Sequence, residues 1–221
     1  KKGGKMRNKS YNSRSSLMDC KSNLLFPDWE TMPRKTITQS TFEADILEFS
    51  PSIVSAIELG MSDLSNFCAQ YPLASRKRNV RATNLNAFVI QQLTAVNGLK
   101  LGEITGNGRR SFIDIGDNRL FPKKIDNLLR PSYISTKTVR MYHNQETIDV
   151  EDDLPITYLG YQVDSGWTHI TGVYAVHMEG NKIEWYTDIV NLAYKNKVLH
   201  RNTTQDIDVS VKKDLRRKRS E

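Results

Sequence analysis

The sequence predicts an α+β fold, in which an antiparallel β-sheet built as a meander packs against two or three helices. Three observations support this prediction. Apolar residues recur at helical spacing in the first half of the chain, and alternation with a period of two replaces it in the second half. Basic residues gather at both ends, next to segments rich in polar residues.

The length of 221 residues suits one medium-sized domain with tails. Of its 32 basic and 25 acidic residues, 20 basic and 23 acidic ones lie between residues 15 and 210, so the positive charge belongs to the termini. We therefore expect a flexible basic arm over residues 1–40, a globular domain over residues 41–200 and a basic tail over residues 201–221.

The start of the arm is a cluster of positive charge, since residues 1–14 contain six basic residues and no acidic one. Clustered cations on a mobile segment bind polyanions, either by releasing counterions from nucleic acid or by approaching anionic lipid. A solvated tail that only aids solubility is the open alternative. The candidate membrane- or ribonucleoprotein-binding residues of the arm are Lys1, Lys2, Lys5, Arg7, Lys9 and Arg14.

An isolated apolar and aromatic segment, LLFPDW, occupies residues 24–29 of the arm. Such a segment inside a polar arm often docks into a groove on a partner or on a neighbouring subunit. We therefore predict that Leu25, Phe26 and Trp29 mediate self-association. The alternative is that the segment folds back onto its own domain.

The predicted domain begins with a strand that runs into a helix. Phe42, Ala44 and Ile46 alternate with acidic residues, which predicts a strand within residues 40–49. A helix should then begin where Ser50 precedes a proline, and Gly60 is a point at which it could divide into two shorter helices.

A polar, basic stretch at residues 74–84 predicts an exposed loop before the next helix. That helix should begin with Asn84 as its cap and end at Gly98. The loop has two interpretations, a phosphate-contacting patch or an ordinary charged loop. Its candidate phosphate-binding residues are Arg76, Lys77, Arg78 and Arg81.

The alternation of apolar and polar residues in the second half of the chain predicts β-structure. A strand over residues 109–121 should break at Gly116, and residues 137–150 should form a hairpin that turns near Asn144. Three strands joined by short glycine-containing turns then predict the meander, at residues 156–163, 170–178 and 183–187. We expect Trp185 and Tyr174 to anchor it against the helix that carries Phe88, Leu93 and Val96.

No motif in the sequence combines a nucleophile, a base and an orienting group, so we predict that the protein is not an enzyme. The four histidines lack metal-ligand spacing, the two cysteines have no CxxC partner, and no glycine-rich loop matches a nucleotide-binding motif. The acidic run at residues 151–153 could bind a divalent cation, but a solvated strand end is the preferred interpretation. We therefore expect no metal and no cofactor.

Three segments of the predicted meander resemble the C-terminal sheet region of rhabdovirus matrix proteins. They are ITYLGYQV, WTHITGVYAVHM and IEWYTDIVNL, and the likeness extends over about residues 40–192. A basic start, a strand and two helices precede the sheet in a similar order. The resemblance implies a viral structural protein that self-associates, binds the ribonucleoprotein and the inner face of a membrane, and condenses the nucleocapsid for assembly and budding.

The resemblance also implies partners and locations. The partners are the viral nucleocapsid with its RNA, the anionic inner leaflet of a membrane, further copies of the chain and a viral glycoprotein. The expected locations are the virion and the cytoplasm and nucleus of the host, with peripheral attachment to membranes. The proline-rich tyrosine peptide that many animal-virus members carry near the N-terminus is absent from this sequence, so recruitment of the host budding machinery is not implied.

The tail segment KKDLRRKR resembles a nuclear import signal, which a host import receptor would bind. Such a signal suits a plant-infecting member of the family that matures in the nucleus. The predicted import residues are Lys212, Lys213, Arg216, Arg217, Lys218 and Arg219.

Two other functions stay open at this point, a nucleic-acid-binding protein and a nucleic-acid-processing enzyme. A basic surface with exposed aromatic side chains would favour the first, because bases stack on aromatic rings. Acid and base residues gathered in one cleft would favour the second.

Overall fold

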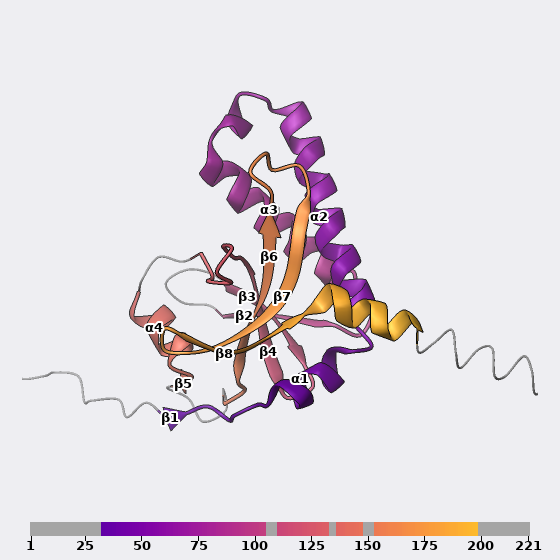
Figure 1. The fold of residues 1–221 in the computed structure, drawn as a ribbon. Helices are drawn as coiled ribbons and strands as arrows, with labels where there is room; N and C mark the ends of the chain where they lie inside the picture. Colours follow the sequence, from indigo (N-terminus) through magenta and orange to yellow (C-terminus); the bar gives the residue numbers. More distant parts are fainter. Residues whose placement is uncertain (1–31, 105–109, 133–135, 148–152, 199–221) are drawn as a thin grey trace, which may run out of the picture. The chain divides into compact units, whose positions relative to one another are not determined.

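One six-stranded sheet organises the part of the chain that the structure describes, and with its helices it makes an α+β fold (Figure 1). The computed structural model describes residues 32–104, 110–132, 136–147 and 153–198. Neighbouring strands are antiparallel except β4 and β6, which are parallel. The strands in their order across the sheet are β2 (Lys100–Ile104), β3 (Arg110–Ile115), β4 (Asn118–Lys124), β6 (Ile156–Val163), β7 (Ile170–Glu179) and β8 (Lys182–Asp188).

The predicted meander is confirmed as strands β6, β7 and β8. Its register pairs Gly160 with Tyr174 and His177 with Trp185. The β7–β8 turn places Gly180 at a φ of +61°, a left-handed conformation that glycine adopts without steric cost. Alternating β-branched and aromatic residues, interrupted by short turns, therefore predicted this part of the fold.

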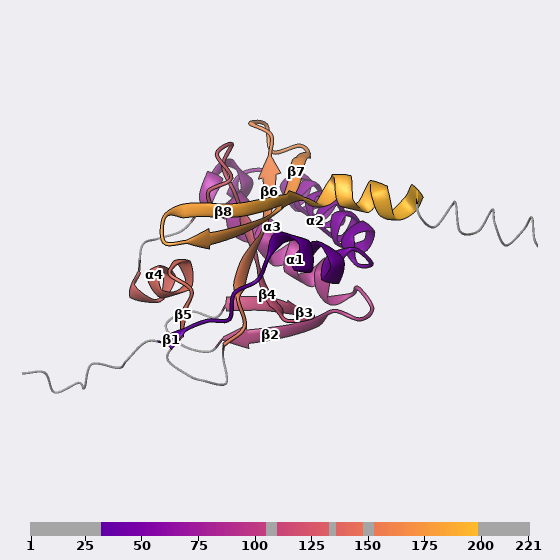
Figure 2. The same cartoon turned by 60° about the horizontal axis from the view of Figure 1, so that its bottom comes forward.

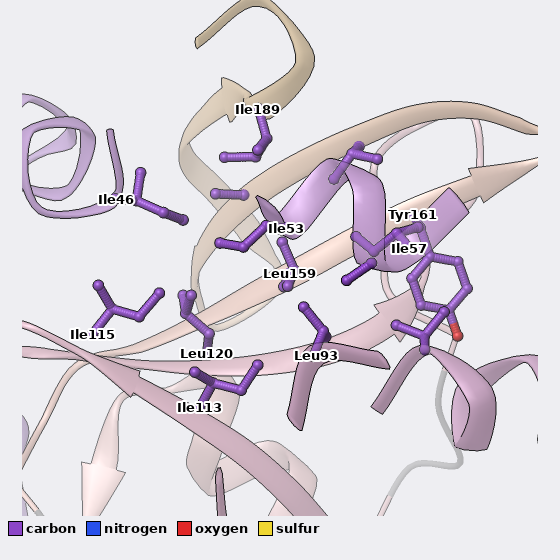
Figure 3. Close-up of a cluster of buried hydrophobic side chains, with 14 of the residues drawn as sticks. Ile46, Ile53, Ile57, Leu93, Ile113, Ile115, Leu120, Leu159, Tyr161 and Ile189 are labelled. Carbon is purple, nitrogen blue, oxygen red and sulfur yellow. The ribbon is translucent and has the colours of Figure 1, made fainter. Parts of the chain in front are cut away.

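Three helices supply the apolar side chains that cover one face of the sheet: α1 (Gln39–Ile46), α2 (Ser50–Gln70) and α3 (Arg78–Thr94). The main core lies between these helices and the sheet, and its residues Ile53, Leu93 and Leu159 are completely buried (Figure 3). Residues 189–198 form another helix, whose first residue, Ile189, joins the same core.

The helix α2 continues without a break through Gly60, so the alternative of two shorter helices is wrong. A Cβ atom on Gly60 would lie 2.9 Å from both the backbone nitrogen and the Cγ2 atom of Val89 in α3. Gly60 therefore allows the two helices to approach more closely than a larger residue would permit.

The opposite face of the sheet carries a second buried cluster, which is rich in aromatic rings. Phe121 of β4 stacks on Tyr142 of α4 (Lys137–His143), with ring centroids 5.3 Å apart. Ile156 and Val176 are completely buried in the same cluster. Both faces of the sheet are thus covered, which explains why the alternating positions of β6 are apolar on both sides.

The start of the described chain is tied to this second face. The short strand β1 (Met32–Pro33) pairs with β5 (Glu146–Thr147). The buried Arg34 donates hydrogen bonds to the carbonyl oxygens of Glu146 and Leu154, at 3.3 and 3.0 Å. Its burial and backbone partners give this arginine a structural role.

The strand predicted within residues 40–49 is wrong, because residues 40–46 belong to α1 and α2 begins at residue 50. The hydroxyl oxygen of Thr38 accepts a hydrogen bond from the backbone nitrogen of Thr41 at 3.2 Å and caps α1. Phe42 and Ile46 lie four residues apart and are both buried, so their spacing fits a helix as well as a strand. In Figure 2, α1 lies beside β8.

The hairpin predicted over residues 137–150 is also wrong, because Lys137–His143 form the helix α4. Thr136 caps this helix by accepting a hydrogen bond from the backbone nitrogen of Val139 at 3.2 Å. Three buried residues at helical spacing and a threonine cap outweigh the β-propensity of the segment.

The loop predicted over residues 74–84 is shorter than expected. A 3-10 turn, η1 (Ala74–Arg76), is followed directly by α3, so Asn84 lies inside the helix and does not cap it. Its side-chain nitrogen donates to the carbonyl oxygen of Val80 at 2.9 Å. No side chain caps the start of α3, and the sequence therefore carries no signal for it.

Of the two predicted aromatic anchors, Trp185 packs against the main core, to which α3 contributes Leu93. The ring of Trp185 lies 5.1 Å from Phe42 of α1 and stacks at 5.0 Å on His177. Tyr174 packs against the second cluster, on the opposite face of the sheet.

Several predicted functional residues lie outside the described residues. They are the basic residues of the arm, the docking segment and the import signal, namely Lys1, Lys2, Lys5, Arg7, Lys9, Arg14, Leu25, Phe26, Trp29, Lys212, Lys213, Arg216, Arg217, Lys218 and Arg219.

Candidate functional site

A cationic pocket of about 320 Å³ is lined by residues of the α2–α3 connection, of the β6–β7 turn and of the end of β4. Three of the four predicted phosphate-contacting residues line it, and Lys77 does not. Its lining residues are Arg76, Arg78, Arg81, Lys124, Val163, Asp164, Ser165 and Trp167.

Hydrogen bonds within the α2–α3 connection position the arginines. The backbone nitrogen of Ser75 donates to the carbonyl oxygen of Tyr71 at 3.0 Å, and its hydroxyl donates to that of Pro72 at 3.2 Å. The Nε atom of Arg81 donates to the carbonyl oxygen of Ser75, which ties α3 to η1. The η1 turn that carries Arg76 is therefore fixed to α3, which carries Arg81.

The start of α3 adds to the positive potential. Arg78 is its first residue and Arg81 follows one turn later, and the first turn contains no acidic residue. The helix macrodipole is positive at this end, so these arginines are placed where a cation is unfavourable. A bound anion would relieve this repulsion.

The β6–β7 turn is organised around the carboxylate of Asp164. Its oxygens accept hydrogen bonds from the backbone nitrogens of Gly166, Thr168 and His169, at 2.9, 2.6 and 2.9 Å, and from the Thr168 hydroxyl at 3.0 Å. These donors hold the pKa of Asp164 well below its ordinary value, so the carboxylate stays ionised. Its charge is already satisfied within the turn.

The same turn fixes Trp167 in the pocket wall. Trp167 has a φ of +61°, a strained conformation for a side chain of this size, and its backbone nitrogen donates to the carbonyl oxygen of Asp164 at 3.1 Å. The surrounding hydrogen bonds hold this strained conformation in place. A half-buried aromatic ring is thereby presented beside the arginines.

Lys124, at the end of β4, lines the pocket on the side of the sheet. Its Nζ atom lies 5.4 Å from the centre of the Trp167 ring, a distance at which a cation is attracted to the ring face. Burial lowers the pKa of Lys124, and the neighbouring Arg78 lowers it further, although Asp126 opposes the shift. An anion in the pocket would therefore stabilise the charged form of this lysine.

Four cationic side chains thus face a single carboxylate whose oxygens are hydrogen-bonded elsewhere. Among the described residues, Arg76, Arg78 and Arg81 form no ion pair with a carboxylate. Arginine presents donors in a planar fork that matches a phosphate. The arrangement is suited to binding one or two phosphate groups.

Other candidate groups from the sequence do not combine into a site. Asp114 accepts two hydrogen bonds from Arg119, at 2.9 and 3.0 Å, and Asp153 forms an ion pair with Lys35 at 2.9 Å. Glu151 and Asp152, the rest of the acidic run, lie outside the described residues. Within the described ranges no three His, Cys, Asp or Glu side chains are grouped so that they could hold a metal ion.

Lys124 and Trp167 are the pocket residues that sequence reasoning missed. Both are distant in sequence from the arginine cluster, and the packing of α3 against the sheet brings them beside it. The one local signal is the turn sequence DSGW, in which a tryptophan follows turn-forming residues.

None of the helices in the described part of the chain has the length and apolar character needed to cross a membrane. Comparisons with protein-family models, with curated proteins and with solved structures find no match to this chain.

Proposed function

We propose that this chain is a viral structural matrix protein whose domain binds phosphate polyanions through the cationic pocket. In this role it self-associates, links the ribonucleoprotein to the inner face of a membrane, and condenses the nucleocapsid for assembly and budding. The observation that carries the proposal is the convergence of Arg76, Arg78 and Arg81 with Lys124 in one pocket.

The charge distribution along the chain supports the same proposal. Both proposed targets, RNA and the inner leaflet, are polyanionic, and the arm and the tail carry most of the excess basic residues. Several weak polyanion contacts on one chain bind jointly more tightly than any one alone. The resemblance of the meander to rhabdovirus matrix proteins supplies the wider context of virion assembly.

A nucleic-acid-binding protein outside a virion is the second candidate function. The specific observation that favours it is Trp167, a half-buried ring in the wall of a cationic pocket. Single-stranded nucleic acid binds in this manner, with bases on aromatic rings and phosphates on basic side chains.

The test compares two triple variants of the full chain that remove the same charge. The first is Arg76→Gln, Arg78→Gln, Arg81→Gln in the pocket, and the control is Lys100→Gln, Lys137→Gln, Arg140→Gln at exposed positions elsewhere. Binding to a single-stranded RNA and to vesicles that contain phosphatidylserine is measured over a range of salt concentrations.

The pocket variant should weaken binding at low salt and reduce the slope of log K against log salt for RNA by about 2, since three phosphate contacts are lost. The control should change both quantities less. Equal effects of the two triple variants on both ligands would overturn the proposal, because the pocket would then contribute only net charge.

A further inference from the structure

The α2–α3 connection, which supplies Arg76 to the cationic pocket, exposes two large apolar side chains. Leu73 is 74% exposed, the highest value among the large hydrophobic residues of the described chain, and Tyr71 is 55% exposed. They lie between the end of α2 and η1, the turn that carries Arg76.

This turn is ordered, which gives the exposed side chains a fixed place. Hydrogen bonds from Ser75 to the carbonyl oxygens of Tyr71 and Pro72 close the turn, and the Arg81 side chain fastens it to α3. The ring of Tyr71 packs against the ring of Phe67 in α2, with ring centroids 5.2 Å apart. Tyr71 and Leu73 thus place exposed apolar surface in the same connection as Arg76.

We propose that this turn is a membrane-docking tip, in which Tyr71 and Leu73 enter the interface of an anionic bilayer while the pocket binds a lipid phosphate. The proposal rests on the proposed function, in which the pocket binds phosphate groups, and assigns the apolar side chains of the turn to the bilayer. Peripheral membrane sites combine the same two elements, apolar side chains that enter the headgroup region and basic side chains that bind anionic lipid.

Charge complementarity identifies the bilayer as the occupant. Arg76 lies three residues after Leu73, and Arg78, Arg81 and Lys124 line the same pocket. A surface that is cationic and apolar at once matches the headgroup and acyl boundary of an anionic leaflet. Trp167 in the pocket wall fits this setting too, because tryptophan is enriched at membrane–water interfaces.

The exposed side chain of Leu73 distinguishes a bilayer from RNA as the ligand of this surface. A phosphate backbone would contact the arginines but would leave an exposed leucine without a partner. The apolar tip therefore predicts a specific asymmetry: its removal should affect vesicle binding and leave RNA binding unchanged.

The test uses the full chain and a matched pair of variants. The tip variant is Tyr71→Ser, Leu73→Ser. The control is Leu128→Ser, Tyr194→Ser, which removes the same residue types at positions that are 65% and 70% exposed and that do not line the pocket. Binding is measured to vesicles of phosphatidylcholine with and without phosphatidylserine, and to a single-stranded RNA.

The tip variant should lose about tenfold or more in affinity for phosphatidylserine vesicles, because two exposed side chains no longer bury apolar surface. The control should bind vesicles as the parent does, and all three proteins should bind RNA equally. Soluble glycerophosphoserine should compete poorly with vesicles, since it supplies the phosphate without the apolar phase.

Two further single variants keep the test independent of folding. Leu73→Ser removes only the more exposed side chain, and Leu73→Trp should raise vesicle affinity without changing the melting temperature. The proposal is overturned if the tip variant binds vesicles as the control does, or if it loses RNA binding to the same extent. The proposed function fails separately, when the arginine triple variant binds both ligands like its own control.

Discussion

His177 is a buried titratable side chain at the centre of the meander. It is 8% exposed, its ring stacks on Trp185 with an interplanar angle of 8°, and its Nδ1 atom lies 3.4 Å from the Thr157 hydroxyl. Burial lowers the pKa of His177, against the opposing effects of the Ile156 backbone and of nearby glutamates. Burial also lowers the pKa of His143 on the other face of the sheet.

These two histidines predict that the domain loses stability in mild acid. The unfolded chain takes up their protons near the ordinary pKa of 6.5, and the folded chain does so only at lower pH. Their contribution is therefore constant above about pH 6.5 and becomes destabilising as the pH falls below it. The melting temperature, followed by circular dichroism from about pH 7.5 to about pH 5, should fall over that window.

His177→Phe retains a ring for stacking and should reduce this pH dependence. The exposed His169 is the matched control, since His169→Gln leaves the buried imidazoles in place. A His177→Phe protein whose melting temperature follows the same pH curve as the parent would show that His177 is not involved.

At the scale of secondary-structure elements, the close contact between α2 and α3 depends on Gly60. A Cβ atom on Gly60 would lie 2.9 Å from the backbone nitrogen of Val89, and backbone cannot move aside as a flexible side chain can. Gly60→Ala should destabilise the domain by about 1–3 kcal/mol, which outweighs the roughly 1 kcal/mol that alanine gains over glycine in helix propensity.

Urea denaturation measures this effect, with Ser55→Ala on the exposed side of α2 as its control. The control should change the free energy of unfolding by no more than about 0.5 kcal/mol. A Gly60→Ala protein as stable as the control would mean that the two helices separate at little cost.

Some helices and strands could be predicted from the sequence, and others could not. The meander could be predicted because its alternation is long and its turns contain glycine, as at Gly180. α1 could not, because Phe42 and Ile46 suit both periods and the cap that decides between them lies outside the apolar pattern, at Thr38. The start of α3 at Arg78 lacks any side-chain cap and was therefore placed too late.

At the scale of the whole molecule, we expect the basic residues of the arm to contribute to the binding of polyanions. Replacing Lys1, Lys2, Lys5, Arg7 and Lys9 by Gln should weaken binding to RNA and to anionic vesicles and should flatten the dependence of binding on salt. Sedimentation with vesicles and RNA binding at low and high salt measure both effects. The melting temperature of the domain should stay the same.

A variant with the same charge change within the domain is the control for this arm variant. Its substitutions are Lys100→Gln, Lys137→Gln, Arg140→Gln, Lys195→Gln and Lys197→Gln, all at exposed positions. Binding by the arm variant that equals binding by this control would remove any special role of the arm.

The candidate site was predictable only in part, for a reason that belongs to the whole molecule. Arg76, Arg78 and Arg81 are close in sequence, and their charge marks them without any knowledge of the fold. Lys124 and Trp167 join them through tertiary structure, which a pattern within one segment cannot reveal. The apolar tip was missed for a related reason, since the exposure of Leu73 is a property of the folded chain.

The parallel pair of β4 and β6 has a consequence for how the chain reaches its fold. In the six-stranded sheet, this pair joins two sets of strands that are each local in sequence, β2 to β4 and β6 to β8. It pairs Arg119 with Ile156, residues that are separated by a long crossover connection. Closing such a loop costs entropy before its contacts are made, so the pairing of β4 with β6 should govern the folding rate. Until it closes, two half-sheets present unpaired edges, and a nascent chain is then most exposed to aggregation.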